Sequence, residues 1–315
     1  MKCSRDIIIW SVGVTALIIL VVSDLLWGGS SGASNPLIIW KLRFPRVLTA
    51  TLAGASLSLA GAQMQSILRN PLADPHIMGV SSGASLGAAV ATMLGGGLTG
   101  IFQGASVTLA AFAGALATAS VILAVSEKIR SATTLLVFGV MLGFIVNAIV
   151  SILQFSSDAE SLKIFYSWSA GSFSHTTSVQ IIVAATALAA GLLLAYRQRK
   201  GLDIILFGDE YARMSGADTG RIRLISILSC CLTTAAVTAF CGPIGFVGIV
   251  APHIARAATG TAAHGRILPA SLLTGALIGV AADLISQLSP APLPIAATMA
   301  LVGTPVILYI LLKKP

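Results

Sequence analysis

Runs of apolar residues, each about as long as a bilayer is thick, follow one another along this 315-residue chain. A transmembrane helix needs about 20 mainly apolar residues, so the pattern predicts ten such helices joined by polar segments. They lie at 7–27, 47–67, 79–98, 104–125, 134–155, 178–196, 223–241, 242–260, 268–288 and 294–312. We therefore expect an all-α membrane protein in which residues 1–315 form a single ten-helix bundle.

Two segments interrupt the regular pattern. The eighth span contains GPIGFVGIVAPHIAR, whose glycines and prolines favour a broken or partly re-entrant helix. Between the second and third spans, Pro71 and Pro75 predict a rigid, non-helical link. Such a link suits either a gate or an ordinary turn.

The composition excludes a soluble protein. Of all residues 56% are hydrophobic and 10% are charged, whereas soluble domains carry about 25% charged residues. We attribute the net charge of +8 to cytoplasmic loops and to contact with anionic lipid, not to nucleic acid. The first apolar run is long and no cleavage site of small residues follows it, which favours a retained helix over a signal peptide.

The basic residues predict the orientation. With the N-terminus inside, 15 of the 19 Lys and Arg residues fall on the inner side and four on the outer side. Because Lys and Arg collect in cytoplasmic loops, we expect both termini to be cytoplasmic, in a multi-pass protein of the cell (inner) membrane. Lys41, Arg43 and Arg46 cluster on the outer side against this bias. The cluster predicts an acidic partner outside the cell.

Few residues suggest chemistry of the chain's own. The four cysteines show no metal-ligand spacing and are expected to be buried free thiols, so we predict no metal and no cofactor. The pattern GxSxG at Gly79–Gly83 lacks a preceding strand and an evident His and acid partner, so we predict helix packing and no catalytic residue. Asp24 and Asp283 lie inside spans, where a proton relay and a pairing with a neighbouring helix are both open.

Two polar loops are long enough to carry structure. The outer loop 156–177 contains LKIFYSW, which predicts a short amphipathic helix at the membrane interface. In the inner loop 197–222, Asp209 is expected to cap a short helix that runs through Met214 and ends at Gly216, and Asp218 to begin a second short turn. This loop is either a docking surface or merely solvated.

Three blocks of sequence together resemble one family. They are RFPRVLTATLAGASLSLAGAQMQSILRNPLADPHIMGVSSGASLG, CGPIGFVGIVAPHIAR and LPIAATMALVGTPVILYILLKK. In this order they are typical of the permeases of bacterial ABC importers for iron-siderophores, haem and cobalamin. The resemblance implies ten helices per subunit, a second permease copy, separate cytoplasmic ATPase subunits, and a periplasmic or lipid-anchored substrate-binding protein. No Gly-Lys dipeptide occurs, so the chain has no Walker A loop of its own.

The resemblance also implies roles for individual residues. Arg43 and Arg46 match outer arginines that dock the binding protein, while Gln287 stands where many relatives have a third arginine. Asn70 and Leu72 match an inner gate. Ser131 matches a second gate layer, although Ala132 replaces the neighbouring hydroxyl residue. The residues expected to couple to the ATPase are Gly208, Asp209, Glu210, Ala212 and Gly216.

The resulting functional prediction is a permease, not an enzyme, that moves a bulky iron chelate (siderophore or haem) into the cytoplasm as a homodimer. Cobalamin is the alternative substrate. A proton-coupled secondary transporter is the alternative mechanism; it would work without an ATPase and fail when Asp283 becomes Asn.

Overall fold

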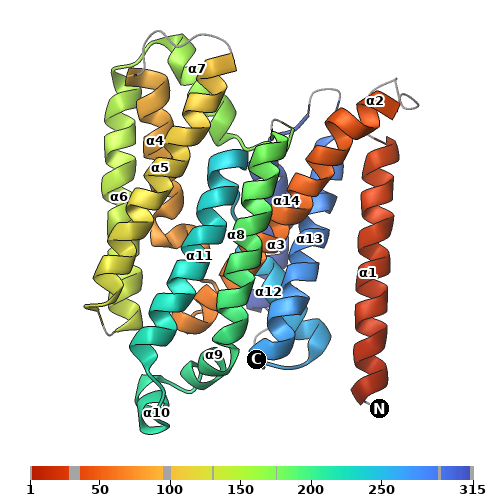
Figure 1. The fold of residues 1–315 in the computed structure, drawn as a ribbon, viewed down its shortest axis with the longest axis vertical. Helices are drawn as coiled ribbons and strands as arrows, with labels where there is room; N and C mark the ends of the chain where they lie inside the picture. The colour runs from red at the N-terminus through yellow and green to blue at the C-terminus, as the bar shows by residue number, and fades with distance from the viewer. Residues whose placement is uncertain are drawn as a thin grey trace.

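The structure is a computed structural model that describes residues 2–27, 36–94, 101–129, 131–174, 176–289 and 292–312. Over these residues it is helical and contains no strand. Figure 1 shows a bundle of roughly antiparallel helices, with α9 (Arg199–Ile205) and α10 (Asp209–Met214) projecting from one end. The start of α1 and the end of α14 lie toward that same end (Figure 1), as expected if both termini share one side of a membrane.

The long helices occupy the predicted spans. They are α1 (Lys2–Trp27), α3 (Phe44–Ile67), α5 (Ile101–Ser126), α6 (Ala132–Phe155), α8 (Ser178–Arg197), α11 (Thr219–Cys241), α13 (His264–Ser286) and α14 (Ile295–Leu312). Seven helical stretches of the described residues are long and apolar enough to cross a membrane, and Val80–Leu94 and Ile295–Tyr309 are shorter apolar helices. Nine of the ten predicted spans are therefore apolar helices.

The remaining elements are short. They are α2 (Pro36–Ile38), the π-helix η1 (Ile39–Arg43), the 3₁₀-helix η2 (Pro75–Met78), α4 (Val80–Ala89), the π-helix η3 (Val90–Leu94), α7 (Ala159–Ser169) and α12 (Val247–Thr259). The predicted amphipathic outer helix is confirmed as α7, in which Phe165 is buried and Tyr166 is 57% exposed. The last residues of the third predicted span, 95–98, lie outside the described part of the chain.

Two predicted boundaries differ from the structure in a way that changes the position of functional residues. The eighth span does not begin at residue 242, because Gly242 (φ 79°) and Phe246 (φ 71°) are not helical and α12 begins only at Val247. The second helical run begins well before residue 47, at Pro36, so the basic cluster KLRFPR lies within helical turns and not in a loop. The helix tolerates these arginines because their side chains find polar partners inside the bundle, as described below.

Helix α3 lies at the centre of the bundle, and 83% of the residues in its most apolar stretch are buried. A Cβ on Gly54 would lie 2.1 Å from the carbonyl oxygen of Gly275 on α13. A Cβ on Gly83 of α4 would likewise lie 2.5 Å from the Gly114 carbonyl oxygen on α5. Small residues thus let helix backbones touch, and the contact at Gly83 confirms the helix packing predicted for Gly79–Gly83.

The link between α3 and α4 re-enters the bundle. A Cβ on Gly248, in the first turn of α12, would lie 2.7 Å from Pro75 Cδ and 3.2 Å from the Leu57 carbonyl oxygen. Gly248 thus lies close to both Pro75 of η2 and Leu57, which is near the middle of α3. The start of η2 therefore packs at the depth of the middle of α3 and not at its inner end. Non-helical backbone at this depth needs protein partners for its polar groups, and it brings the predicted rigid link against the break before α12.

The buried thiols agree with prediction. Cys230, Cys231 and Cys241 are free and buried in α11. The side chain of Cys3 lies outside the described part, as do those of five basic residues counted for the orientation, namely Lys2, Arg5, Arg130, Lys313 and Lys314.

Candidate functional site

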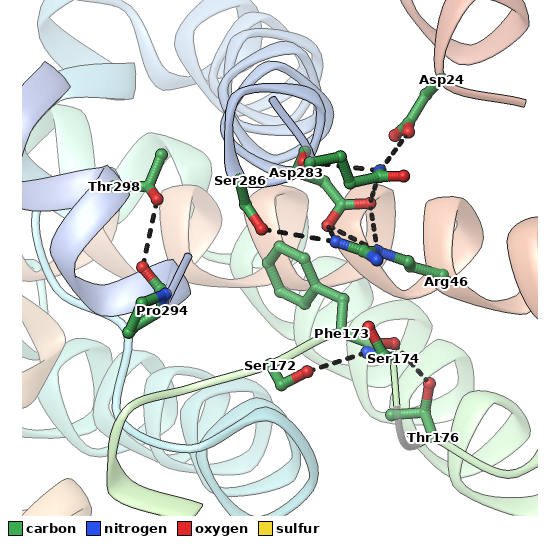
Figure 2. Close-up of polar contacts among 11 residues, drawn as sticks. Asp24, Arg46, Ser172, Phe173, Ser174, Thr176, Asp283, Ser286, Pro294 and Thr298 are labelled. Carbon is green, nitrogen blue, oxygen red and sulfur yellow. Dashed lines mark hydrogen bonds and ion pairs between the residues drawn. The ribbon is translucent and has the colours of Figure 1, made fainter. Parts of the chain in front are cut away.

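The outer end of the bundle holds a buried ion pair. Arg46 on α3 places Nε 2.9 Å from both carboxylate oxygens of Asp283 on α13, and its Nη2 lies 2.8 Å from Oδ1. The same Nη2 is 3.4 Å from the Ser286 hydroxyl (Figure 2). The Asp283 side chain is fully buried and that of Arg46 is 14% exposed. Charge-assisted, forked contacts of this kind are the strongest hydrogen bonds a protein makes.

Gln287 extends this pair to a second carboxylate. Its Nε2 donates to Asp24 Oδ1 at 2.6 Å and to Asp283 Oδ2 at 3.2 Å. Asp24 comes from α1 and is 1% exposed, and its Oδ2 has no hydrogen-bond partner among the described residues. The two carboxylates therefore share the Gln287 amide, and Arg46 is bonded to Asp283. The sequence left two roles open for Asp283, a proton relay and a pairing with a neighbouring helix. The structure shows the pairing, as an ion pair with Arg46 on α3.

Arg43 also points into the protein. Its Nη1 donates to the carbonyl oxygens of Leu25 at 2.9 Å and Leu26 at 3.3 Å, and the residue is 6% exposed. The last carbonyls of a helix lack partners within the helix, and a basic side chain there also complements the helix dipole. Arg43 thus closes the outer end of α1. Both arginines expected to face a docking partner are bonded within the chain.

The inner loop folds into α9 and α10. The helix predicted from Asp209 to Met214 is confirmed, and Gly216 (φ 78°) follows its last turn. Two details were wrong. Gly208 occupies the N-cap, leaving Asp209 to pair with Arg223 at 2.6 Å. Asp218 caps the long helix α11 through the Arg221 amide, because the chain continues directly into that span.

An apolar surface covers the tip of this segment. Phe207 is 75% exposed, Tyr211 56% and Met214 89%, and the rings of Phe207 and Tyr211 lie 5.5 Å apart. On the opposite side Ala212 is fully buried, while Glu210 is exposed. Sequence reasoning missed this surface. The signal was present as apolar residues spaced i, i+4, i+7 within a charged loop.

The predicted gate residues occupy two places. Asn70 Oδ1 accepts from the Leu72 amide at 2.9 Å, which fixes the link after α3. Beside them Arg69 (φ 48°) lies 3.5 Å from Asp209, so the link after α3 touches the start of α10. Ser131 caps α6 by accepting from the Thr134 amide at 3.3 Å. The structure brings Asn70, Leu72 and Asp209 into one region.

Ser81 has a neighbour that sequence reasoning did not foresee. His76 Nδ1 hydrogen-bonds to Ser81 Oγ, its Nε2 contacts the Ile244 carbonyl oxygen, and Asp74 Oδ1 lies 3.9 Å from Nε2. The prediction that Ser81 has no histidine partner is therefore wrong, and it cannot serve as an argument against catalysis. The packing interpretation stands on other grounds: Ser81 is buried inside α4, no strand precedes it, and a carbonyl occupies the second ring nitrogen.

Comparison with known proteins decides the family. Residues 7–313 match the FecCD transport family. The chain belongs to that family. It is 36% identical to the uncharacterised ABC transporter permease YvrB of Bacillus subtilis, over 91% of this chain and 83% of that protein. It is 32% identical to the vitamin B12 import permease BtuC of Klebsiella pneumoniae (97% and 94%) and to the hemin permease HmuU of Yersinia pestis (92% and 87%).

A solved structure shares the fold of this FecCD permease. A metal-chelate type ABC transporter in an inward-facing conformation matches it with a TM-score of 0.87 and 27% identity, over 98% of this chain and 100% of that one. The chain is thus the permease subunit of an ABC importer and lies in the inner membrane, as the sequence resemblance implied.

Proposed function

We propose that two copies of this permease form a homodimer that imports a bulky iron chelate, a ferric siderophore or haem. Separate cytoplasmic ATPase subunits drive transport, and a periplasmic or lipid-anchored binding protein delivers the chelate. The observation that carries the ATP-driven part of the proposal is the exposed apolar surface of Phe207, Tyr211 and Met214, in the segment of α9 and α10 that lies at the same end as the termini. Exposed apolar patches mark interaction sites, and the ATPase is the partner that an importer requires there.

The unpartnered faces of α6 and α14 support an apolar pathway between the two copies. Phe144 and Ile145 on α6 and Leu301 on α14 are 61–73% exposed. These faces present large apolar side chains to the outside of the subunit. Such a lining accommodates a bulky chelate without binding it tightly, so specificity resides in the binding protein. The relatives named for hemin and for a metal chelate favour iron chelates.

Cobalamin import is the second candidate. It is favoured by the vitamin B12 permeases, which match over 97% of this chain at the same identity as the hemin permease. Both substrates are large and metal-bearing, and the same apolar faces suit either.

The inner residues receive roles within this proposal. Asn70 and Leu72 form the inner gate, and Ser131 belongs to a second layer. The contact between Arg69 and Asp209 supports a connection from that gate to the coupling segment. The coupling residues are Gly208, Asp209, Glu210, Ala212 and Gly216.

The binding protein is proposed to dock at the outer end around Arg43, Arg46 and Gln287. Because both arginines already donate within the chain, carboxylates of the partner would join these contacts and not meet free cations. Arg43→Gln, and the double variant Arg46→Met, Asp283→Leu, which removes both members of the buried pair, should each reduce binding-protein-stimulated ATP hydrolysis in vesicles while the complex still assembles. The exposed Lys41, changed to Gln, is the matched control. Unchanged stimulation in both arginine variants would contradict the docking role.

Reconstitution tests the function as a whole. The permease, its ATPase and its binding protein are placed in proteoliposomes, and uptake of a ferric siderophore, haem and cobalamin is measured with and without ATP. We expect ATP-dependent uptake of an iron chelate. Uptake of cobalamin alone would favour the second candidate, and uptake that persists without the ATPase would refute both.

A further inference from the structure

Three side chains from distant parts of the sequence meet at the inner ends of three helices. His264, the first residue of α13, is fully buried. Its Nδ1 lies 2.6 Å from Asp203 Oδ1 on α9, and its Nε2 lies 2.6 Å from the Ser66 hydroxyl on α3. The His264 backbone amide also donates to Asp203 Oδ1, at 2.7 Å. A single carboxylate oxygen therefore caps α13 and holds the imidazole ring.

The arrangement resembles a catalytic triad but cannot serve as one. Ser66 and His264 are both 0% exposed, so no substrate reaches the hydroxyl. The Ser66 hydroxyl also lies 3.0 Å from the Ala62 carbonyl oxygen within its own helix. Since a carboxylate only accepts, Nδ1 carries a proton and donates to Asp203. The three groups join helices instead of performing chemistry.

Each end of this chain of contacts leads to a region with a proposed role. Asp203 lies four residues before Phe207, whose ring begins the apolar surface at the tip. Ser66 lies four residues before Asn70, in the link assigned to the inner gate. His264 therefore bridges the segment that would face the ATPase and the helix that carries the gate.

A second contact runs between the same two regions but is weaker. Arg69 and Asp209 are 3.5 Å apart, and the Arg69 side chain is 41% exposed. Exposed ion pairs contribute little, because water and salt screen them. The Asp203 side chain is 36% exposed, but breaking its contact with His264, or that of His264 with Ser66, leaves a buried imidazole nitrogen or hydroxyl without that partner, which is costly. The connection through the buried His264 is thus the stiffer of the two.

We propose that Asp203, His264 and Ser66 are positioning residues that transmit displacement of α9 and α10 to the inner end of α3. The proposal rests on the function proposed above. When ATP closes the ATPase subunits against α10, Asp203 moves with α9 and carries His264 and Ser66, and the link at Asn70 moves with them. Loss of these hydrogen bonds would leave ATP hydrolysis intact but would weaken its coupling to movement of the gate.

The test compares three variants, each with one aspartate replaced, in the full complex in proteoliposomes. Transport of a ferric siderophore and ATP hydrolysis are measured in the same vesicles, with haem and cobalamin tested in parallel. Asp203→Ala removes the acceptor and should lower substrate moved per ATP by about fivefold. Asp203→Asn keeps an oxygen acceptor at that position and should stay within about twofold of the unmodified complex. Asp218→Ala is the matched control, because Asp218 caps α11 without reaching another helix's side chain.

Each outcome decides the proposal. An unchanged transport-to-hydrolysis ratio in Asp203→Ala would overturn it, and so would an equal loss in Asp203→Asn. If Asp203→Ala does not assemble, Ser66→Ala removes only a hydroxyl at the far end of the chain and must itself lower the ratio; a normal ratio there rejects the linkage. Failure of the unmodified complex to transport would instead refute the proposed function, which separates the two results.

Discussion

The two ends of this permease differ in which side chains they expose. At the outer end, Arg46 and Asp283 form a buried ion pair and Arg43 closes α1, so charges that looked available in sequence are turned inward. At the inner end, Phe207 and Tyr211 are 75% and 56% exposed on the tip formed by α9 and α10. Charged residues in the sequence therefore mark where the fold itself needs polar groups, whereas exposed apolar surface marks the proposed contact with the ATPase.

The contrast has an energetic basis. Removing one member of a buried ion pair costs about 3–5 kcal/mol, because the other charge stays buried. Removing a solvent-exposed aromatic group costs the isolated protein little, and its loss is felt only in a complex. We thus expect changes at the outer end to lower the stability of the permease, and changes at the inner tip to lower its affinity for the ATPase.

The largest effect is expected at the inner tip. Tyr211→Asp places a charge at the centre of the proposed ATPase contact and should weaken co-purification of the ATPase by more than about tenfold, as loss of an aromatic hot spot does. Tyr166 on α7 is the matched control, since it is 57% exposed at the opposite end. Pull-down of the ATPase with each variant provides the measurement. Equal retention of the ATPase by Tyr211→Asp and Tyr166→Asp would show that the tip is not the contact.

The next largest effect concerns stability at the outer end. Asp283→Ala leaves Arg46 buried without its carboxylate and should destabilise the permease by about 3–5 kcal/mol. The double variant Arg46→Met, Asp283→Leu should recover most of the loss, because well-packed apolar residues can replace a buried pair. Thermal unfolding of the detergent-solubilised protein gives the comparison. If the double variant is no more stable than Asp283→Ala, the ion pair is not the source of the loss.

Much of the fold follows from the sequence, because apolar runs of bilayer length leave few alternatives. The short helix at Asp209–Met214 was also predictable, from a polar start and a glycine end. Helix starts that depend on distant residues were not. α13 begins at His264 and not at residue 268, because Asp203, 61 positions away in sequence, supplies the cap.

The site was predictable in identity but not in geometry. The sequence places Arg46 and Asp283 near the same end of neighbouring helices, yet nothing local shows that they bond, since 237 positions separate them. The exposure of Phe207 and Met214 likewise depends on how α10 projects from the bundle. Side-chain direction is a tertiary property, and the charge rule that located the outer arginines carries no information about it.

A smaller effect tests the charge balance of the outer end. Gln287 now offers only a neutral amide to Asp24 and Asp283. Gln287→Arg would place a second cation between the two carboxylates and should stabilise the permease by about 1 kcal/mol, since hydrogen bonds to charged groups are stronger. Gln287→Leu is the control and should destabilise it. A lower thermal midpoint for Gln287→Arg than for the unmodified protein would show that the pocket cannot admit the larger side chain.

The smallest effect is expected on the outer helix α7, which neither the ion pair nor the inner tip touches. Hydrogen bonds from the Ser161 side chain and backbone hold the pKa of the Asp158 carboxyl below its ordinary value. Because the pKa is lower in the folded protein, the carboxylate stabilises the folded helix fully above the pKa of the unfolded chain, about 3.9. This stabilisation is lost as the pH falls through the pKa of the folded protein. Amide exchange in the first turn of α7, corrected for intrinsic rates, should therefore quicken below about pH 4. Asp158→Asn, which cannot titrate, should remove this dependence, and the same acid response in that variant would assign the effect to another group.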